Sequence, residues 1–304
     1  YYSKTSANLL LLNPIPPSLG YTSNPFSNIG KVLNRGFEFT VRGTPINREN
    51  FTWDATFIGS TLHNEVLSLG GLAPITISSI NVNRRFIPGR SSGAWYVKRV
   101  HGYDPNTGIV TVSDTAEYAG NQLPTTQGSF NTTFTLFKKL RLYALFQGQT
   151  GAKTWNLTEE YQDQFIGNSA GKVIPAGQPG GYSAEDYHKR FGPFVTVSGK
   201  ALSSAGAPVA DAYLQSSNSL RLQELSATLS VPSSLARSLR ASGASFTIGG
   251  RNLRLWKNKG NTQWDPDVAQ TLGGADSRYT QFQTAELFTT PPVRRWFARL
   301  NLQF

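Results

Sequence analysis

Cysteine and methionine are both absent from the 304 residues. Without cysteine, a disulfide scaffold, a thiolate metal site and a cysteine nucleophile are excluded. Long hydrophobic runs are missing as well: a run such as Leu9 to Leu12 ends at Asn13, far short of the about 18 residues of a membrane-spanning helix. This excludes a helical membrane protein, but not a membrane protein built of strands.

Charged residues are also scarce. They make up 15% of the sequence and hydrophobic residues 38%, against about 25% and about 45–50% in a typical globular protein. Ser, Thr, Asn, Gln and Gly fill the deficit. A chain poor in both classes is either disordered or repetitively β, and 12% aromatic residues argue against disorder. Residue 1 is not methionine and no signal-peptide pattern follows it, so we expect the sequence to begin within a longer one.

The strongest positive signal is strict two-residue alternation of apolar and polar side chains. It runs through Asn34–Thr44, Phe51–Ser60, Leu140–Gln149 and Trp296–Phe304. This period predicts β-strands with one dry face and one wet face.

In two further strands the alternation slips by one residue. One slip lies between Leu222 and Leu225, and the other lies across Gly249-Gly250. A slip of one residue predicts a β-bulge. The only short helices we expect lie around Glu185–Arg190 and Ser233–Ser242.

The connections between strands are of two kinds. Short ones lie at Pro45–Glu49, at Lys138-Lys139 and after Pro232, and long ones span Ala152–Ser217 and Lys257–Pro292. All short turns fall at one end and all long loops at the other if Leu72–Ser113 contributes two strands, one ending near Val82 and one through Trp95–Tyr103. The total is then about ten strands of about 9–11 residues, the length that crosses a bilayer at a tilt of about 45°.

Alternation alone favours a soluble β-sandwich, whose dry face is its core. Three features favour a transmembrane β-barrel. The loop lengths are asymmetric, and the wet face is rich in Thr, Ser, Asn, Gln and Arg, which suits a water-filled lumen. The third is that Trp296 and the terminal Phe304 share a face and suit the two membrane interfaces. Only a closed barrel satisfies the backbone of a sheet in a membrane.

Several short motifs resemble one family. They are Asn28-Ile29-Gly30, Asn34-Arg35-Gly36-Phe37-Glu38, Leu220-Arg221-Leu222, Gly250-Arg251-Asn252-Leu253, Asp265-Pro266-Asp267 and Asn301-Leu302-Gln303-Phe304. In this order, over nearly the whole chain, they resemble the barrel of the SusC/RagA-like TonB-dependent outer-membrane transporters.

The resemblance implies an all-β fold: an antiparallel transmembrane β-barrel segment with long extracellular loops. Residues 1–304 would be an incomplete, C-terminal part of a 22-stranded barrel, with the plug domain and the TonB-contacting box absent. The resemblance also implies structural roles for the motif residues Asn34, Gly36, Glu38, Gly250, Arg251, Asn252, Asp265, Pro266 and Phe304.

The function that the resemblance implies is uptake of oligosaccharides or peptides across the bacterial outer membrane. The implied partners are a SusD-like lipoprotein, the TonB complex acting through the missing plug, and outer-membrane lipid. Neither catalysis nor a cofactor is implied. The alternative from another class is a soluble secreted β-sandwich or a carbohydrate-binding module.

The residues suggest no catalytic or metal chemistry. His63, His101 and His188 lack ligand spacing. Asp265 and Asp267 form a carboxylate pair that could indicate acid–base work, but the resemblance makes them structural. The net charge of +11 could indicate nucleic-acid binding, yet the basic pairs are scattered and form no stripe, so we expect no nucleic-acid partner.

Aromatic residues in the loops are the candidates for ligand binding, because sugars commonly stack on flat rings. The candidates are Trp95, Tyr96, Trp155, Tyr182 and Trp264. Packing within the loops, or a girdle at the membrane interface, explains each of them equally well.

Overall fold

The computed structural model describes residues 1–12, 26–79, 82–103, 110–162, 195–197, 200–201, 210–238, 240–263, 265–267, 270–271 and 284–304. Strands dominate this part of the chain. Its helical segments are short: α1 (Leu157–Tyr161), α4 (Ser233–Ser238) and the 3-10 helix η3 (Ala210–Tyr213). Among the described residues, no helix has the length and apolar character needed to cross a membrane.

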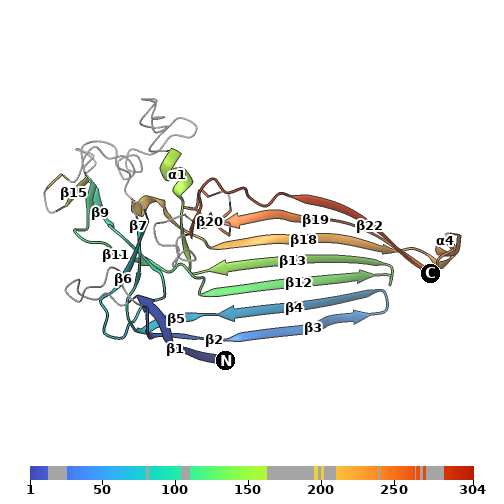
Figure 1. Ribbon diagram of the computed structural model, residues 1–304. Coiled ribbons are helices and arrows are strands. Elements are labelled where there is room, and N and C mark those ends of the chain that lie inside the picture. The colour runs from blue at the N-terminus through green and yellow to red at the C-terminus, as the bar shows by residue number, and fades with distance from the viewer. Residues whose placement is uncertain are drawn as a thin grey trace.

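Seven long antiparallel strands form the main sheet in the order β22-β19-β18-β13-β12-β4-β3. Figure 1 shows them lying side by side. Their bounds are β3 (Glu38–Arg48), β4 (Phe51–Thr61), β12 (Thr126–Leu136), β13 (Leu140–Thr150), β18 (Ser219–Ser230), β19 (Gly243–Lys257) and β22 (Arg295–Gln303). We call this sheet, with the extension described next, the wall.

The wall continues past β3 and β4. The strand β2 (Phe26–Gly36) leads through Phe37 into β3. In the same way β4 leads through Leu62 into β5 (His63–Ser68). The Thr61 N–H donates to the Phe37 carbonyl at 2.8 Å across the junction. β1 (Tyr2–Leu12) pairs with β2 and adds an eighth strand.

The register places apolar side chains on one face of the wall and polar side chains on the other. Phe130 lies opposite Phe57 and Phe146, whereas Gln149 lies opposite Gln127 and Ser219. We call these the apolar face and the polar face. Alternation along each strand produces them, because successive side chains of a strand point to opposite sides.

The apolar face is not the core of a sandwich. Leu225, Ile248 and Trp296 are 49%, 54% and 74% exposed. Among the described residues, no second sheet packs on these side chains. The sandwich alternative is therefore wrong for this fold.

The expected asymmetry of the connections is confirmed. Turns at residues 49–50, 137–139 and 231–242 lie at one end, the turn end, together with α4 (Figure 1). The described parts of the connections at residues 69–125, 151–218 and 258–294 lie at the other end, the loop end. The first turn comes later than the expected Pro45–Glu49, because β3 continues past an irregularity between Gly43 and Ile46.

The strand assignment within Leu72–Ser113 needs correction. β4 pairs directly with β12 along its whole length, so the segment between them adds no strand to the wall. It forms short strands at the loop end instead, and the wall has eight strands where about ten were expected. The short strands of the loop end are β6 (Ile75–Ser79), β7 (Val82–Phe86), β8 (Ala94–Val97), β9 (Val100–Tyr103), β10 (Val110–Val112), β11 (Glu117–Gly120), β14 (Lys153–Trp155), β15 (Val195–Val197), β16 (Lys200–Ala201), β17 (Leu214–Ser216), β20 (Gln270–Thr271) and β21 (Thr284–Ala285).

One of the two predicted bulges lies where expected. In β18 the register shifts between Leu222 and Glu224, against both neighbouring strands. In β19 the irregularity lies after Arg251, at Asn252, whose φ is 54°. It does not lie at Gly249-Gly250, which pair regularly on both sides.

The largest buried cluster of the described residues lies at the loop end. It joins parts of all three long connections, and we call it the loop core. Its members are Trp95, Val97, Ala119, Trp155, Leu157, Tyr213, Leu214 and Ala285. The wall is thus flanked at one end by a packed body and at the other by tight turns.

Candidate functional site

A groove on the polar face, near the loop end of the wall, is the candidate site. It encloses about 360 Å³, within the about 300–1,000 Å³ of ligand pockets. We call it the polar groove. Its lining residues are Ile58, Gly59, Ser60, Gln127, Gly128, Ser129, Gln147, Gly148, Gln149, Ser219 and Asp267.

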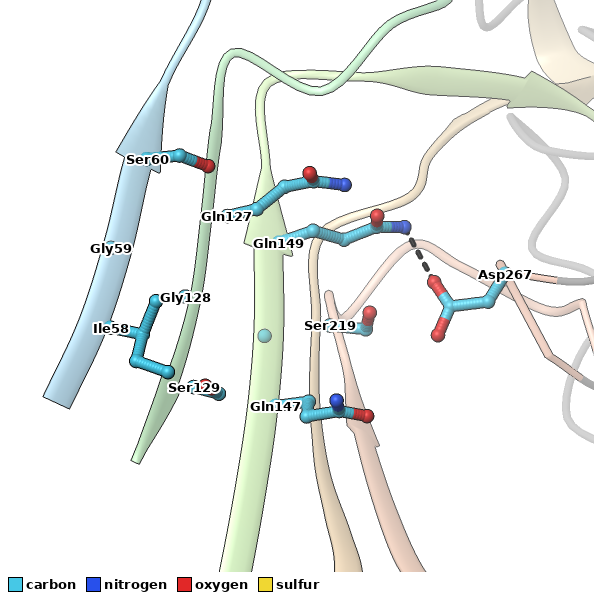
Figure 2. A pocket seen from close by; sticks show the side chains of 11 residues that line it. Ile58, Gly59, Ser60, Gln127, Gly128, Ser129, Gln147, Gln149, Ser219 and Asp267 are labelled. Atoms are coloured by element: carbon cyan, nitrogen blue, oxygen red, sulfur yellow. Dashed lines mark hydrogen bonds between the residues drawn. The ribbon is translucent and has the colours of Figure 1, made fainter. Parts of the chain in front are cut away.

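The wall's register builds the groove in two rows. The first row crosses four neighbouring strands in register, with Ser60 opposite Gln127, Gln127 opposite Gln149, and Gln149 opposite Ser219. Figure 2 shows these side chains on the same side of the strands as Asp267. Four strands thus present a continuous line of hydroxyl and amide groups.

The second row lies two residues closer to the turn end on each strand. Ile58 lies opposite Ser129, and Ser129 lies opposite Gln147. Ile58 is 45% exposed. The groove therefore combines amides and hydroxyls with one accessible apolar side chain.

A turn of the third long connection is anchored beside the groove. Arg221 of β18 donates from Nη2 to both carboxylate oxygens of Asp265, at 2.6 and 2.7 Å, and to Asp267 at 2.9 Å. Gln149 Nε2 donates to the other oxygen of Asp267 at 2.5 Å (Figure 2). Arg221 and Asp265 are 8% and 3% exposed. Because charge-assisted bonds are the strong ones, this cluster fixes the turn on the wall.

The predicted motif residues Asp265 and Pro266 thus meet in one anchor, and both are buried. The two aspartates are not arranged as an acid–base pair facing an open site, since Arg221 forms an ion pair with both of them. The Asp267 N–H also donates to Asp265 at 3.0 Å.

The motif residues of β2 and β3 lie on the same wall, further from the anchor. Asn34 accepts from the Asn64 amide at 2.7 Å, and Asn64 accepts in turn from Ser91 and Ser92 at the loop end. Glu38 is exposed and lies opposite Ser60.

Two of the motif glycines are places of close approach. A Cβ at Gly36 would lie 1.9 Å from the Thr61 carbonyl oxygen. At Gly250 it would lie 2.6 Å from Leu253 and 2.9 Å from the Trp296 ring. No larger residue fits either position without movement.

The remaining motif residues belong to β19 and to the end of the chain. Arg251 Nε donates to Glu224 at 2.8 Å. Asn252 occupies the left-handed region and donates to the Val293 carbonyl at 3.3 Å. Phe304 lies at the turn end and is 84% exposed.

The three loop aromatics that the structure describes, Trp95, Tyr96 and Trp155, do not line the polar groove. Trp95 and Trp155 are 2% and 1% exposed and belong to the loop core, so their rings are closed to a ligand in this structure. Tyr96 is also buried, edge-on to Tyr118. Tyr182 and Trp264 lie outside the described residues.

Trp95 instead packs against a cation. The Arg84 guanidinium lies 3.9 Å from its ring centre, a cation–π contact. Burial lowers the pKa of Arg84 to about 9. The Trp95 ring N–H also donates to the Lys153 carbonyl. With one face on Arg84 and its N–H bonded, Trp95 has a structural role in the loop core.

Two of the three histidines lie in the described part of the chain, and each contacts a glutamate. His63 contacts Glu65 at 3.0 Å and His101 contacts Glu117 at 3.1 Å, whereas His188 lies outside the described residues. In the described part of the chain, no three metal-ligating side chains gather. The part of the site that sequence reasoning missed is Gln127, Gln147 and Gln149. Their signal was present as polar positions of alternating strands, but their convergence depends on register.

No family model matches the chain. It is 25% identical over 288 residues to the TonB-dependent receptor P26 of Formosa agariphila, which covers 85% of this chain and 28% of the receptor. The TonB-dependent receptor SusC of Bacteroides thetaiotaomicron is 35% identical over 71 residues, 23% of this chain and 7% of SusC.

The fold is similar to chains in structures of the RagAB peptide transporter. In the "open-open" state of that importer the TM-score is 0.69 at 17% identity, covering 99% of this chain and 32% of that chain. A second RagAB structure gives 0.63 at 18% identity, covering 87% and 30%.

These similarities confirm the resemblance stated from the motifs, and they confirm an antiparallel β-barrel segment that does not close by itself. The chain spans 28% of the length of P26, so it corresponds to a part of such receptors. The relatives named here are receptors and a transporter, and none is named as an enzyme.

Proposed function

Because the sequence and fold of this chain are similar to those of SusC/RagA-like TonB-dependent receptors, we propose that it forms part of a transporter that takes up nutrients across the bacterial outer membrane. In this proposal residues 1–304 are one barrel segment. Its apolar face contacts lipid and its polar face lines the water-filled lumen. The observation that carries the proposal is the wall itself, with exposed Leu, Ile and Trp on one face and the polar groove on the other.

The two faces of the wall differ in the environment that stabilises them. Apolar surface gains about 25 cal/mol per Å² when it leaves water, so a wide exposed apolar face is stable only against another apolar medium. The wall offers the backbone pairing that hydrocarbon requires, because each inner strand is bonded on both sides.

Partners follow from the same proposal. The loop end would face outward and meet a SusD-like lipoprotein, while the TonB complex would act through a plug domain elsewhere in the receptor. The cargo would be oligosaccharides or peptides. Support comes from the relatives, which are named as TonB-dependent receptors and as a peptide importer.

We further propose that the segment is not catalytic and holds no cofactor. The described residues of the polar groove contain no histidine, and its one carboxylate, Asp267, is held by Arg221 and Gln149. The groove can bind, but it offers no free general base and no nucleophile with a base beside it.

The test is uptake by the source bacterium. Deleting the gene that encodes this segment should abolish uptake of at least one labelled oligosaccharide or peptide pool, and deleting tonB should do the same. The receptor should fractionate with the outer membrane and require detergent for extraction. A product that is secreted and monodisperse without detergent would overturn the proposal in favour of a soluble binding module.

A further inference from the structure

The polar groove has a chemistry more selective than its position alone implies. Among its described lining residues none is aromatic and none is cationic. The one charged side chain that lines it is Asp267, and the anchor of Arg221, Asp265 and Asp267 carries one more negative than positive charge. An anionic ligand is disfavoured there, and among the described lining residues no ring is available for the stacking that commonly grips sugars.

What the groove offers is amide groups. Each of Gln127, Gln147 and Gln149 carries both a donor and an acceptor. A peptide group likewise carries one N–H and one C=O. In an extended chain the N–H and the C=O of one residue point to the same side, so a glutamine amide can pair with both through two hydrogen bonds, which a single hydroxyl cannot reproduce with the same geometry.

The spacing of the amides fits an extended chain. Gln147 and Gln149 are two residues apart on the same face of β13, hence about 6.7 Å apart along the strand. An extended peptide repeats its backbone groups at the same interval. Gln127 stands opposite Gln149 on the neighbouring strand, about 4.8 Å away, and faces the same space in Figure 2.

The groove also has a place for a side chain. Ile58 lies on the polar face in the second row, and nearly half of its surface is exposed. Serine hydroxyls flank it rather than charges, as at Ser129. An apolar side chain of the ligand can therefore bury surface against Ile58 while the backbone pairs with the amides.

We propose that the polar groove is a subsite for the backbone of an extended, neutral or cationic peptide, with Gln127 and Gln147 as its direct contacts. This rests on the proposed transport function and specifies its cargo. Gln149 serves chiefly to hold Asp267, so it is not the residue to test first.

The experiment uses the full-length receptor, purified in detergent with its lipoprotein partner. The probes are a tryptic digest of casein and, separately, maltoheptaose. The peptides retained by the complex are quantified by mass spectrometry. Gln127→Leu and Gln147→Leu should each weaken peptide retention about three- to tenfold, the effect of one or two lost hydrogen bonds.

Two further variants guard against misfolding. Asn131→Leu removes an amide from the same face of β12, outside the groove, and should leave retention unchanged. Gln147→Glu is nearly isosteric but lacks the amide donor, and it should lose retention as Gln147→Leu does. Equal amounts of receptor in the outer membrane are required for all variants.

The outcomes separate the two proposals. Peptide retention that Gln127→Leu and Gln147→Leu do not change overturns the subsite while transport stands. Retention of maltoheptaose and not of peptides overturns the peptide assignment and leaves uptake intact. Retention of neither probe, with no uptake defect on gene deletion, overturns both.

Discussion

At the scale of single residues, Arg221 holds together parts of the chain that are far apart in sequence. Its guanidinium forms ion pairs with Asp265 and Asp267, which lie 44 and 46 residues later. Removing one partner of a buried ion pair costs about 3–5 kcal/mol, because the other charge is left without compensation. The turn at residues 265–267 therefore depends on this one cation.

We predict that Arg221→Gln releases this turn from the wall. In the purified receptor, trypsin should cut at Lys257 or Lys259 at least several times faster than in the wild type. Arg299→Gln is the matched control, because Arg299 is exposed on the same face near the turn end. Restored protection in Arg221→Gln/Asp265→Asn would support charge compensation as the cause, and unchanged cleavage in Arg221→Gln would contradict the anchor.

A second residue-scale prediction concerns Lys153, at the margin of the loop core. Burial, with a contribution from the nearby Arg99, lowers the pKa of the Lys153 ammonium. Because the folded pKa lies below the unfolded one, the charged form opposes folding at neutral pH. This penalty fades as the pH rises through the folded pKa toward 10.5.

Lys153→Met should therefore stabilise the loop core at pH 7.5, by about 0.5 kcal/mol or less given partial solvent screening. The gain should shrink at pH 10. Pulse proteolysis in urea at the two pH values measures it. A gain that grows with pH would contradict the direction of the shift.

At the scale of elements, the strands β19 and β22 meet through a glycine. A Cβ at Gly249 would lie 2.7 Å from the Phe297 ring, 2.7 Å from the Ser226 Cβ and 2.9 Å from the Leu225 carbonyl oxygen. The ring could rotate away, but the backbone oxygen cannot. The close packing of Phe297 over β19 thus requires glycine.

We predict that Gly249→Val costs about 1–3 kcal/mol through overpacking and lowers the amount of assembled receptor. Heat-modifiable migration of outer-membrane fractions on gels reports assembly. Gly43→Val provides the comparison, because a Cβ at Gly43 has no atom within 4 Å. Equal assembly of the two variants would show that crowding at Gly249 is not limiting.

The positions of the strands were the feature of the fold that the sequence predicted best. Alternation located β3, β4, β13 and β22, since burial of one face forces a period of two. The predicted number of strands was wrong at Leu72–Ser113. All short turns fall at one end and all long loops at the other whether this segment contributes two strands to the wall or none. The bulge of β19 was placed at two glycines, whereas Asn252 adopts the left-handed conformation.

The site was less predictable, for a physical reason. Motif reasoning singled out Asp265 and Pro266 but could not name Arg221 as their partner, because that contact is made through the fold. The row from Ser60 to Ser219 requires the register of four strands, which no local pattern encodes. Trp95 and Trp155 were ligand candidates as aromatic residues in loops, yet large rings also gain most from burial.

At the scale of the whole molecule, the two faces of the wall should respond differently to charge. Ile248 lies near the middle of the apolar face, and Asn131 near the middle of the polar face. Ile248→Lys should cost about 2–4 kcal/mol in a bilayer, whereas Asn131→Lys should be nearly neutral. Receptor yield in the outer membrane is the measurement, and the opposite ranking would invert the assignment of lipid and lumen.

The loop core has a mechanical consequence. Hydrogen bonds tie Trp95 to Lys153, Asn156 to Tyr213 and Glu286 to Trp155, so all three long connections are cross-linked. Segments joined in this way share their displacements: a force applied to one is transmitted to the other two. The loop core would then be displaced as one body, because none of its three segments can move without the other two.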